Sequence, residues 1–550
     1  MPMPGIEFTT QAPKGAELSS RADVAMFVGL ISRRVGALPD KLASRLKVDG
    51  WTEEGVFKLP EGRLEKLLGV PVAAHSWAEF DALYDWKSRP TAPGSADLIP
   101  CPLGLSVQQF FRQGGAKAYI VRTGDPVPLA DPDSSAGDFL AAKLAAISNS
   151  DVLSSAEAIP ILPGYDGAGK QADSLDPATW LGAAAIFAVP DAAMLLLPDI
   201  VDLCSGAPRI DPPFDKALGA DENFRPCAPP APHVGAEPRV SRPAYLAPRL
   251  DIGGFRRWSG ALRYAVTLLS RPKGPAHRRD VILVNAMPLP AHVPELGTTT
   301  EFSPLELLAN PQLGNPGGTD PAPMFGESVL GSRYLQLGYP WLRTAEAQNC
   351  PEGLQSPDGA LAGMIARTSL SDGAFRSAAG RNLRGSIGLY PQLAGSDLAK
   401  RHHGNSDWLG ERLCLFGVRA EQLELISDST MAENTLWRTG GVSRLMGIIL
   451  RASRYLGDDL LFEPSGSALW NRLRNSMEQL FERLRALGAF SGASRDEAYL
   501  VRCDRSTMTQ NDIDAGRVIC QISFSPAYPI ERITVTLALL DAPAILAEAA

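Results

Sequence analysis

The sequence from residue 461 to residue 537 reads LFEPSGSALWNRLRNSMEQLFERLRALGAFSGASRDEAYLVRCDRSTMTQNDIDAGRVICQISFSPAYPIERITVTL. Its first part predicts a long helix from Ser467 to Leu487, because apolar residues recur every three or four positions and Gly488 follows. The expected apolar stripe is Leu469, Leu473, Met477, Leu480, Leu484 and Leu487. Two strands are predicted next, at 498–503 and 518–524, on either side of a polar loop. This region therefore favours an α+β domain.

Upstream of this region, short apolar runs alternate with amphipathic segments. Runs of four to eight apolar residues predict buried strands, and three- to four-residue periodicity predicts helices. The predicted strands are 24–31, 118–121, 192–197 and 281–285, and the predicted helices are 51–72, 76–84, 105–111, 258–269 and 442–456. The sequence thus predicts an α/β and α+β multidomain protein.

Each end of the chain carries an isolated β pattern. Ile6 and Phe8 alternate with polar residues near the N-terminus, and Ile533, Val535 and Leu537 do so near the C-terminus. A lone strand leaves its backbone N–H and C=O groups unpaired, so it must join a sheet edge within the subunit or on a neighbour. We therefore predict that the strand at each end pairs with a sheet edge, either within the subunit or on a neighbour.

Composition excludes several classes of protein. The chain has 550 residues, enough for three or four domains, and its net charge of −8 argues against a nucleic-acid partner. Seven cysteines with no CxxC pair predict reduced thiols. The sequence MPMPGIEFTT lacks the features of a signal peptide, and prolines interrupt the apolar stretch at 181–203. We expect synthesis in the cytoplasm and no membrane insertion.

Three motifs suggest chemistry, and each has a simpler interpretation. Residues 164–171, GYDGAGKQ, fit part of a phosphate-binding loop, but Gln171 replaces the Ser or Thr that would hold Mg²⁺. His402 and His403 near Asp407 lack metal-ligand spacing. Asp504, Asp512 and Asp514 lack the calcium-loop pattern and fit turn formation.

These patterns predict no catalytic, metal or cofactor-binding residues, and we expect no enzyme activity. Cys503 and Cys520 lie on neighbouring predicted strands, where free cysteines usually behave as small buried apolar residues. Two other functions stay open at this point. One is a soluble nucleotide-binding α/β enzyme, which only the loop at 164–171 supports, and the other is a static shell protein.

The C-terminal third resembles the contractile tail sheath proteins of phages and of phage-tail-like contractile injection systems. The matching motifs, in order, are Phe462-Glu463-Pro464, Ala468-Leu469-Trp470, Gly488–Gly492, Tyr499–Asp504 and Thr507–Arg517. Upstream, HSWAEFDALY, LSVQQFFRQGGAKAYIVR, RYLQLGYPWLR and GALAGMIARTSLSDGAFRSAAG resemble further segments of that family. The segments at 375–380 and 426–431 depart from it, so the chain fits either the bulk subunit or a paralogue at the baseplate or collar.

The resemblance implies a structural subunit that polymerises helically around an inner tube and contracts to drive the tube through a target envelope. It implies a subtilisin-like central domain, arms that add strands to neighbouring C-terminal domains, and contacts with an inner tube protein, baseplate and tail terminator or cap proteins, and sheath paralogues. The subunit would belong to a phage tail or phage-tail-like particle, cytosolic or released. The expected divisions are an N-terminal arm at 1–20, an N-terminal α/β segment at 21–125, a central domain at 126–415, a C-terminal domain at 416–529 and a C-terminal arm at 530–550.

In such relatives the C-terminal domain touches the inner tube. The long helix at 467–487 would then present its charged face to the tube, and the residues on that face are Arg474, Glu478, Glu482 and Arg485. The same residues also fit an ordinary solvated face with i,i+4 ion pairs.

Overall fold

The computed structural model describes residues 21–148, 158–165, 167, 172–208, 245–270, 277–289, 291–292, 301–302, 331–393, 409–460, 463–464, 466–514 and 517–528. The chain forms two compact units, residues 1–464 and residues 465–550. Both predicted arms lie outside the described residues, and so do their strand residues Ile6, Phe8, Ile533, Val535 and Leu537. The strands expected there stay predictions.

The first unit is built on an eight-stranded sheet. In spatial order its strands are β17 (Gln422–Leu425), β16 (Cys414–Arg419), β12 (Leu335–Tyr339), β9 (Ile282–Ala286), β8 (Met194–Leu196), β1 (Ala25–Leu30), β7 (Ala118–Gly124) and β3 (Val72–Ala74). The six inner strands are parallel, and the edge strands β17 and β3 are antiparallel to their neighbours. The predicted α/β class is therefore confirmed.

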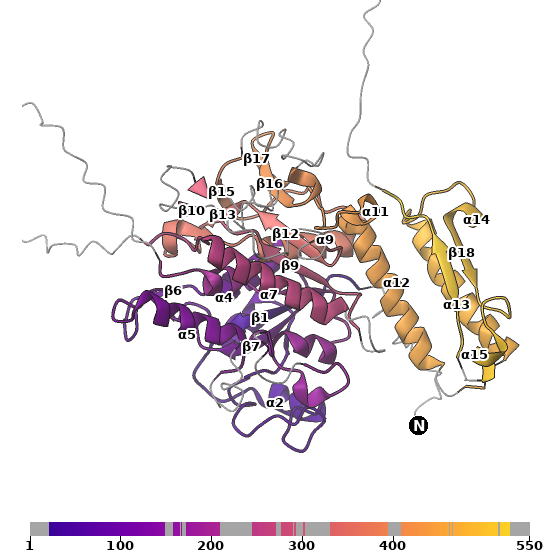
Figure 1. The fold of residues 1–550 in the computed structure, drawn as a ribbon, viewed down its shortest axis with the longest axis horizontal. Helices are drawn as coiled ribbons and strands as arrows, with labels where there is room; N and C mark the ends of the chain where they lie inside the picture. The colour runs from indigo at the N-terminus through magenta and orange to yellow at the C-terminus, as the bar shows by residue number, and fades with distance from the viewer. Residues whose placement is uncertain are drawn as a thin grey trace, which may run out of the picture. The chain divides into compact units, whose positions relative to one another are not determined.

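Helices cover both faces of this sheet, as parallel sheets require (Figure 1). Successive residues of β1 alternate between two apolar cores, with Met26 and Val28 in one and Ala25 and Phe27 in the other. Helices α5 (Ala136–Ser148), α6 (Ile200–Cys204) and α7 (Ile252–Ser270) contribute to the first core. Helices α3 (Trp77–Leu83), α4 (Pro102–Gln113) and α9 (Asp358–Ser371) contribute to the second.

Smaller elements surround this framework. A three-stranded antiparallel sheet has the order β14 (Leu354–Gln355), β13 (Trp341–Thr344) and β15 (Ser386–Tyr390). Short strand pairs are β2 (Ser32–Arg33) with β4 (Tyr84–Asp85), β5 (Arg89–Pro90) with β6 (Leu98–Ile99), and β10 (Ala291–His292) with β11 (Glu301–Phe302). The remaining helices among the described residues of the unit are α2 (Asp40–Val48), α11 (Thr435–Arg438), α12 (Gly440–Asp459) and the 3₁₀ turns at 177–179, 182–188, 351–353 and 409–411.

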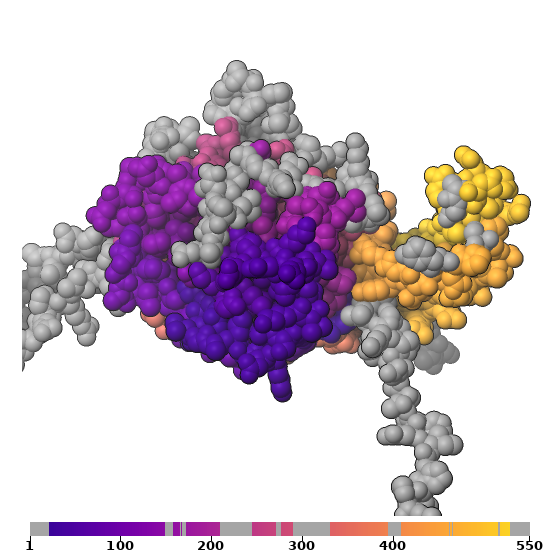
Figure 2. All heavy atoms as spheres, turned by 90° about the horizontal axis from the view of Figure 1, so that it is seen from below, coloured from indigo at the N-terminus to yellow at the C-terminus, as the bar shows by residue number. Residues whose placement is uncertain are grey.

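The eight-stranded sheet crosses two of the boundaries expected from the sequence. Its strands come from both the 21–125 and the 126–415 segments, and β16 spans the expected boundary at 415/416. In the space-filling view of Figure 2, the indigo N-terminal residues adjoin the purple residues that follow them in sequence. Within the first unit these segments share one framework.

Several predicted elements are confirmed. The helix predicted at 105–111 is the central part of α4, which ends where Gly114 adopts a left-handed φ of 110°. Ser76 caps α3 by accepting a hydrogen bond from the Glu79 backbone, and Glu79 in turn accepts one from the backbone of His75. The predicted helices at 258–269 and 442–456 lie within α7 and α12.

The helix predicted at 51–72 is wrong. That segment forms consecutive turns, and the helix of this region is α2, which precedes it. Leu67 has a left-handed φ of 50°, and Gly62 and Gly69 have φ values near 77° and 76°. A helix cannot accommodate these conformations, and Pro60 removes a backbone donor.

Two glycines allow α9 to pack closely on α4. A Cβ atom added at Gly359 would lie 2.0 Å from the Ser106 carbonyl oxygen, and one added at Gly363 would lie 2.5 Å from the Phe110 carbonyl oxygen. Both contacts are with backbone, which cannot move aside locally. The segment GALAGMIART therefore owes its two glycines to close helix packing.

Replacing Gly363 with alanine is expected to lower the free energy of unfolding by about 1–3 kcal/mol, because the methyl group overpacks the α4–α9 contact. Urea denaturation of the full chain measures this change. Gly457→Ala in α12 is the matched control, since a Cβ atom there meets nothing within 4 Å. The control should be neutral or stabilising by up to about 1 kcal/mol. Equal effects of the two substitutions would contradict the packing explanation.

Candidate subunit interface

The second unit contains a two-stranded antiparallel sheet on a long helix (Figure 1). Helix α13 (Ser467–Ala486) is followed by α14 (Arg495–Ala498), β18 (Tyr499–Arg502), α15 (Gln510–Asp514) and β19 (Gln521–Phe524). The register pairs Tyr499 with Phe524 and Arg502 with Gln521. The helix and both strands confirm the elements predicted for this region.

Aromatic side chains hold this sheet to the helix. Phe481 of α13 stacks on Phe490 with ring centroids 5.3 Å apart, and it lies 5.2 Å from the Tyr499 ring and 5.8 Å from the Phe524 ring. Each of these rings buries a large apolar surface, so together they stabilise the unit despite its small size.

The buried stripe of α13 differs from the predicted one. Its buried residues are Leu469, Trp470, Met477, Phe481 and Leu484. Leu487 is 61% exposed, because it is the C-cap residue beyond the last helical turn. Leu473 and Leu480 are only half-buried. The buried face of the helix therefore includes Trp470 and Phe481, which the pattern of leucines did not indicate.

One edge of the two-stranded sheet has no strand beside it among the described residues. The backbone N–H of Ser525 donates to the Ala498 carbonyl, so the hydrogen-bonded pairs of the ladder are 498–525, 500–523 and 502–521. Antiparallel geometry then points the backbone groups of Tyr499 and Val501 away from β19. Of these groups, the Tyr499 N–H donates to the Arg495 carbonyl at the end of α14. The opposite edge is partly covered, because residues 489–491 hydrogen bond to residues 525–527. The outer edge of β18 is therefore the open site for an added strand.

Three of the four charged residues predicted to face an inner tube form contacts within the second unit. Arg485 pairs with Glu482 at 2.6 Å, and Tyr499 donates a hydrogen bond to Glu482 at 3.0 Å. Glu478 pairs with Arg495 at 2.7 Å. The hydrogen bond from Arg485 is the largest influence on Glu482 and lowers the pKa of its carboxyl. These charges connect α13 to the start of β18.

Arg474 differs from the other three residues. Its side chain is half-buried, and its Nε has no hydrogen-bond partner among the described residues. Whether the four residues touch an inner tube stays a prediction.

In the first unit, two buried carboxylates hold helix α12 through its arginines. Asp428 accepts hydrogen bonds from Arg444 Nη1 at 3.0 Å, from Gln336 at 2.8 Å and from the Ala378 backbone at 2.8 Å. Burial by itself would raise the pKa of Asp428, but the charge of Arg444 and these hydrogen bonds hold it below its usual value.

Asp280 contacts α12 about two and three turns further along, at Arg451 and Arg454. Arg454 donates to Asp280 Oδ1 at 3.2 Å, Arg451 lies 3.6 Å from Asp280 Oδ2, and Arg278 pairs with it at 3.2 Å. Burial would raise the pKa of Asp280, but the three arginines lower it. Sequence reasoning missed this network, although arginines at 444 and 451 on the buried side of an apolar helix were a usable signal.

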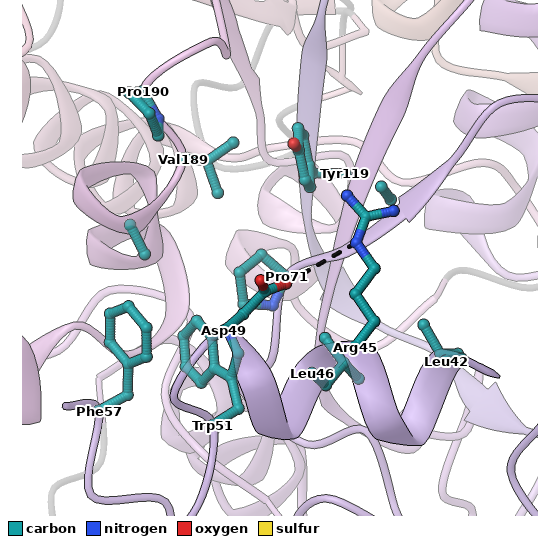
Figure 3. Close-up of a pocket in the computed structure, with 12 residues that line it drawn as sticks. Leu42, Arg45, Leu46, Asp49, Trp51, Phe57, Pro71, Tyr119, Val189 and Pro190 are labelled. Atoms are coloured by element: carbon teal, nitrogen blue, oxygen red, sulfur yellow. Dashed lines mark ion pairs between the residues drawn. The ribbon is translucent and has the colours of Figure 1, made fainter. Parts of the chain in front are cut away.

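A cavity of about 280 Å³ lies beside α2 in the first unit (Figure 3). The stacked rings of Trp51 and Phe57 line it with Tyr119, and the exposed ion pair of Arg45 and Asp49 lies at its side. The residues that line it include no cysteine, histidine or serine.

The other motifs show no chemistry within the described residues. Gly164 and Gly167 both have φ of 76°, and the Gly167 N–H donates to the Gly164 carbonyl in a tight turn. Lys170, Gln171, His402, His403 and Asp407 lie outside the described residues. Asp504 accepts a hydrogen bond from the Ser506 backbone, as expected for a turn. Asp512 and Asp514 lie in α15 instead, where Asp512 accepts from the Thr509 backbone and Asp514 from the Gln510 side chain.

No group of residues suited to a metal ion occurs in the described part of the chain. The helices of that part also include none that is long and apolar enough to cross a membrane.

Residues 432–539, which contain α12 and the two-stranded sheet, match the family model of the phage tail sheath C-terminal domain. This chain is similar to phage tail sheath proteins. The resemblance predicted from the sequence is thereby confirmed. No curated protein matches the chain.

Solved structures extend the similarity over nearly the whole tail sheath-like chain. A chain from the contracted-state baseplate of the anti-feeding prophage superimposes with a TM-score of 0.54 at 16% identity, covering 98% of this chain and 99% of the other. A chain from the six-fold symmetrised baseplate of the same particle gives a TM-score of 0.50 at 16% identity, with the same coverage. At these identities the likeness establishes the fold.

Proposed function

We propose that the protein is a structural subunit of a contractile tail sheath in a phage tail or phage-tail-like particle. It polymerises helically around an inner tube, and contraction of the polymer drives the tube through a target envelope. The observation that carries this proposal is the open edge of β18, within a region that matches the tail sheath C-terminal domain.

The open edge gives the terminal arms a binding site. The Tyr499 carbonyl and both backbone groups of Val501 can pair with an extended segment, and a two-stranded sheet gains stability from a third strand. An arm from a neighbouring subunit supplies that strand, with Ile6 and Phe8 or with Ile533, Val535 and Leu537 on alternate positions. Backbone pairing keeps neighbouring subunits connected while they rotate during contraction.

The proposed role is structural and needs no nucleotide. Within the described residues the molecule offers packing surfaces and buried ion pairs and no metal-binding group. The proposed partners are further copies of the chain, an inner tube protein, and baseplate, terminator or cap proteins, with sheath paralogues at the ends of the polymer. Both solved chains that support the shared fold come from baseplates of a contractile particle.

Electron microscopy of the purified full chain tests this proposal. Helical tubes with a central channel are the expected result. Closed shells would favour a static shell protein, and discrete oligomers that hydrolyse ATP would favour a nucleotide-binding enzyme. Either outcome would overturn the proposal.

The charged side of α13 is the proposed contact with the inner tube. Exchanging Arg474 and Arg485 for glutamate is expected to give a folded subunit that assembles only in the contracted form or without a tube. Weak polar contacts repeated around each ring suit this role, because contraction must break all of them. Co-assembly with the tube protein, followed by electron microscopy, measures the fraction of extended particles.

Because Arg485 also pairs with Glu482, the control for that experiment must preserve the charge change while leaving the tube face intact. Arg502→Glu with Arg505→Glu, at two exposed positions of the same unit, is such a control. A normal yield of extended particles from the double variant would show that another element touches the tube.

A further inference from the structure

Two cysteines face each other across the C-terminal sheet. The β18–β19 ladder pairs Arg502 with Gln521, and its next position places Cys503 directly opposite Cys520. Beyond the effect of burial, the two thiols are close enough for Cys503 to raise the pKa of Cys520, so the two side chains are neighbours. All six cysteines in the described residues are free, these two included.

The ladder geometry places this pair where a disulfide fits. Hydrogen-bonded pairs alternate along the ladder at 498–525, 500–523 and 502–521, so 503–520 is a non-hydrogen-bonded pair. Such pairs have Cα atoms about 4.5 Å apart. Disulfides span Cα distances of about 4.4–6.8 Å, so the two sulfurs can join without moving the backbone.

The loop between the two cysteines is also held closed. Thr507 Oγ1 donates to the Ile519 carbonyl at 2.7 Å, and Arg517 pairs with Asp512 at 2.8 Å. These contacts keep the ends of the loop together whether or not the sulfurs are joined. Cys503 is 1% exposed, whereas Cys520 is partly exposed, so an external reagent reaches Cys520 first.

We propose that Cys503 and Cys520 form a redox site that closes to an intramolecular disulfide in the presence of a small-molecule disulfide such as oxidised glutathione. The Cys520 thiolate attacks the glutathione disulfide, its S–S bond breaks, and one glutathione leaves as a thiolate. Cys503 then loses its proton and attacks the Cys520 sulfur, which releases the second glutathione. Two cysteine thiols are oxidised, and one glutathione disulfide is reduced to two thiols.

The surroundings make this reaction conditional. Burial raises the pKa of both thiols, that of Cys520 to about 12, while the charge of Asp504 opposes and that of Arg474 favours ionisation of Cys503. Thiolate is therefore scarce at neutral pH, and the rate of closure should rise roughly tenfold per pH unit between pH 7 and pH 9. In a reducing compartment the site stays open.

Closure would fix the register of β18 and β19, the sheet to which the arms would add. An effect on arm binding is the one consequence that rests on the proposed function. The chemistry can be tested on the isolated chain, without assembly. Failure of the disulfide and failure of sheath formation are thus separate outcomes.

The test uses the full chain at pH 8.5 with oxidised glutathione, followed by alkylation and tryptic digestion without reduction. Trypsin releases residues 503–505 and residues 518–532 as separate peptides, because arginines precede and end both. Mass spectrometry should find these two peptides joined, and reduction should separate them. Cys350→Ser, at another partly exposed cysteine, is the matched control and should leave the joined peptides unchanged.

Cys503→Ser is expected to stop the reaction at a stable glutathione adduct on Cys520, and circular dichroism would show that the variant is folded. Cys520→Ser should give neither the adduct nor the joined peptides. A wild-type chain that retains glutathione on Cys520 without joining to Cys503 would overturn the proposal. So would Cys520 joined to a different cysteine, or no reaction of Cys520 while Cys350 is modified.

Discussion

Replacing Asp428 with asparagine is expected to lower the free energy of unfolding of the first unit by about 3–5 kcal/mol. The side chain is fully buried, and both of its oxygens accept hydrogen bonds from donors, Arg444 and Gln336 among them. Asparagine keeps the shape but removes the charge and turns an NH₂ group toward these donors. Arg444 would then be a buried cation without its counter-charge. Urea or thermal denaturation of the full chain measures the loss.

Asp49→Asn is the matched control for this experiment. Asp49 also faces an arginine, but its ion pair with Arg45 spans 3.8 Å and both side chains are more than half exposed. Such a pair contributes at most about 0.5 kcal/mol. A second variant, Asp428→Asn with Arg444→Met, should regain part of the lost stability, because it removes the unpaired charge. Similar losses from Asp428→Asn and from the control would contradict the assigned role.

The same carboxylate predicts how stability depends on pH. The pKa of Asp428 is lower in the folded chain than its ordinary value near 3.8, so the unfolded chain binds a proton more readily. The stability that Asp428 contributes is therefore present above about pH 4 and is lost as the pH falls through the folded pKa. Asp428→Asn should flatten this part of the acid unfolding curve.

Deleting either terminal arm is expected to abolish tube formation and leave a folded, soluble subunit. From the sequence pattern we expect residues 1–20 and residues 530–550 to contribute nothing to the core of either unit. Their loss should therefore remove only the strands that would pair with a neighbour. Without those strands the outer edge of β18 stays unfilled in the polymer. Electron microscopy counts the tubes, and circular dichroism verifies the fold.

Shorter deletions serve as controls for this experiment. Removing residues 1–4 keeps Ile6 and Phe8, and removing residues 541–550 keeps Ile533, Val535 and Leu537. Both controls should form tubes. Tubes of normal length from either long deletion would show that the arms are not the connection between subunits.

Much of the second unit was predictable from the sequence because its signals are local. The length of α13, its end before Gly488 and the two strands after it depend on periodicity and on residues within a few positions of one another. The turn at Asp504 is local in the same sense. The face that α13 buries was less predictable, because Phe481 packs on aromatic residues from the following loop and strands.

The sequence by itself determined the class of fold, the long helices, four strands of the eight-stranded sheet, both strands of the second unit and the resemblance to tail sheath proteins. Only the tertiary structure decided that segments from residue 25 to residue 425 join one eight-stranded sheet, because strand order depends on contacts between distant segments. The turns at 51–69 override their helical pattern since glycine and proline impose other backbone angles. The partners of Arg444 and the pairing of Cys503 with Cys520 were likewise set by packing, which no local pattern encodes.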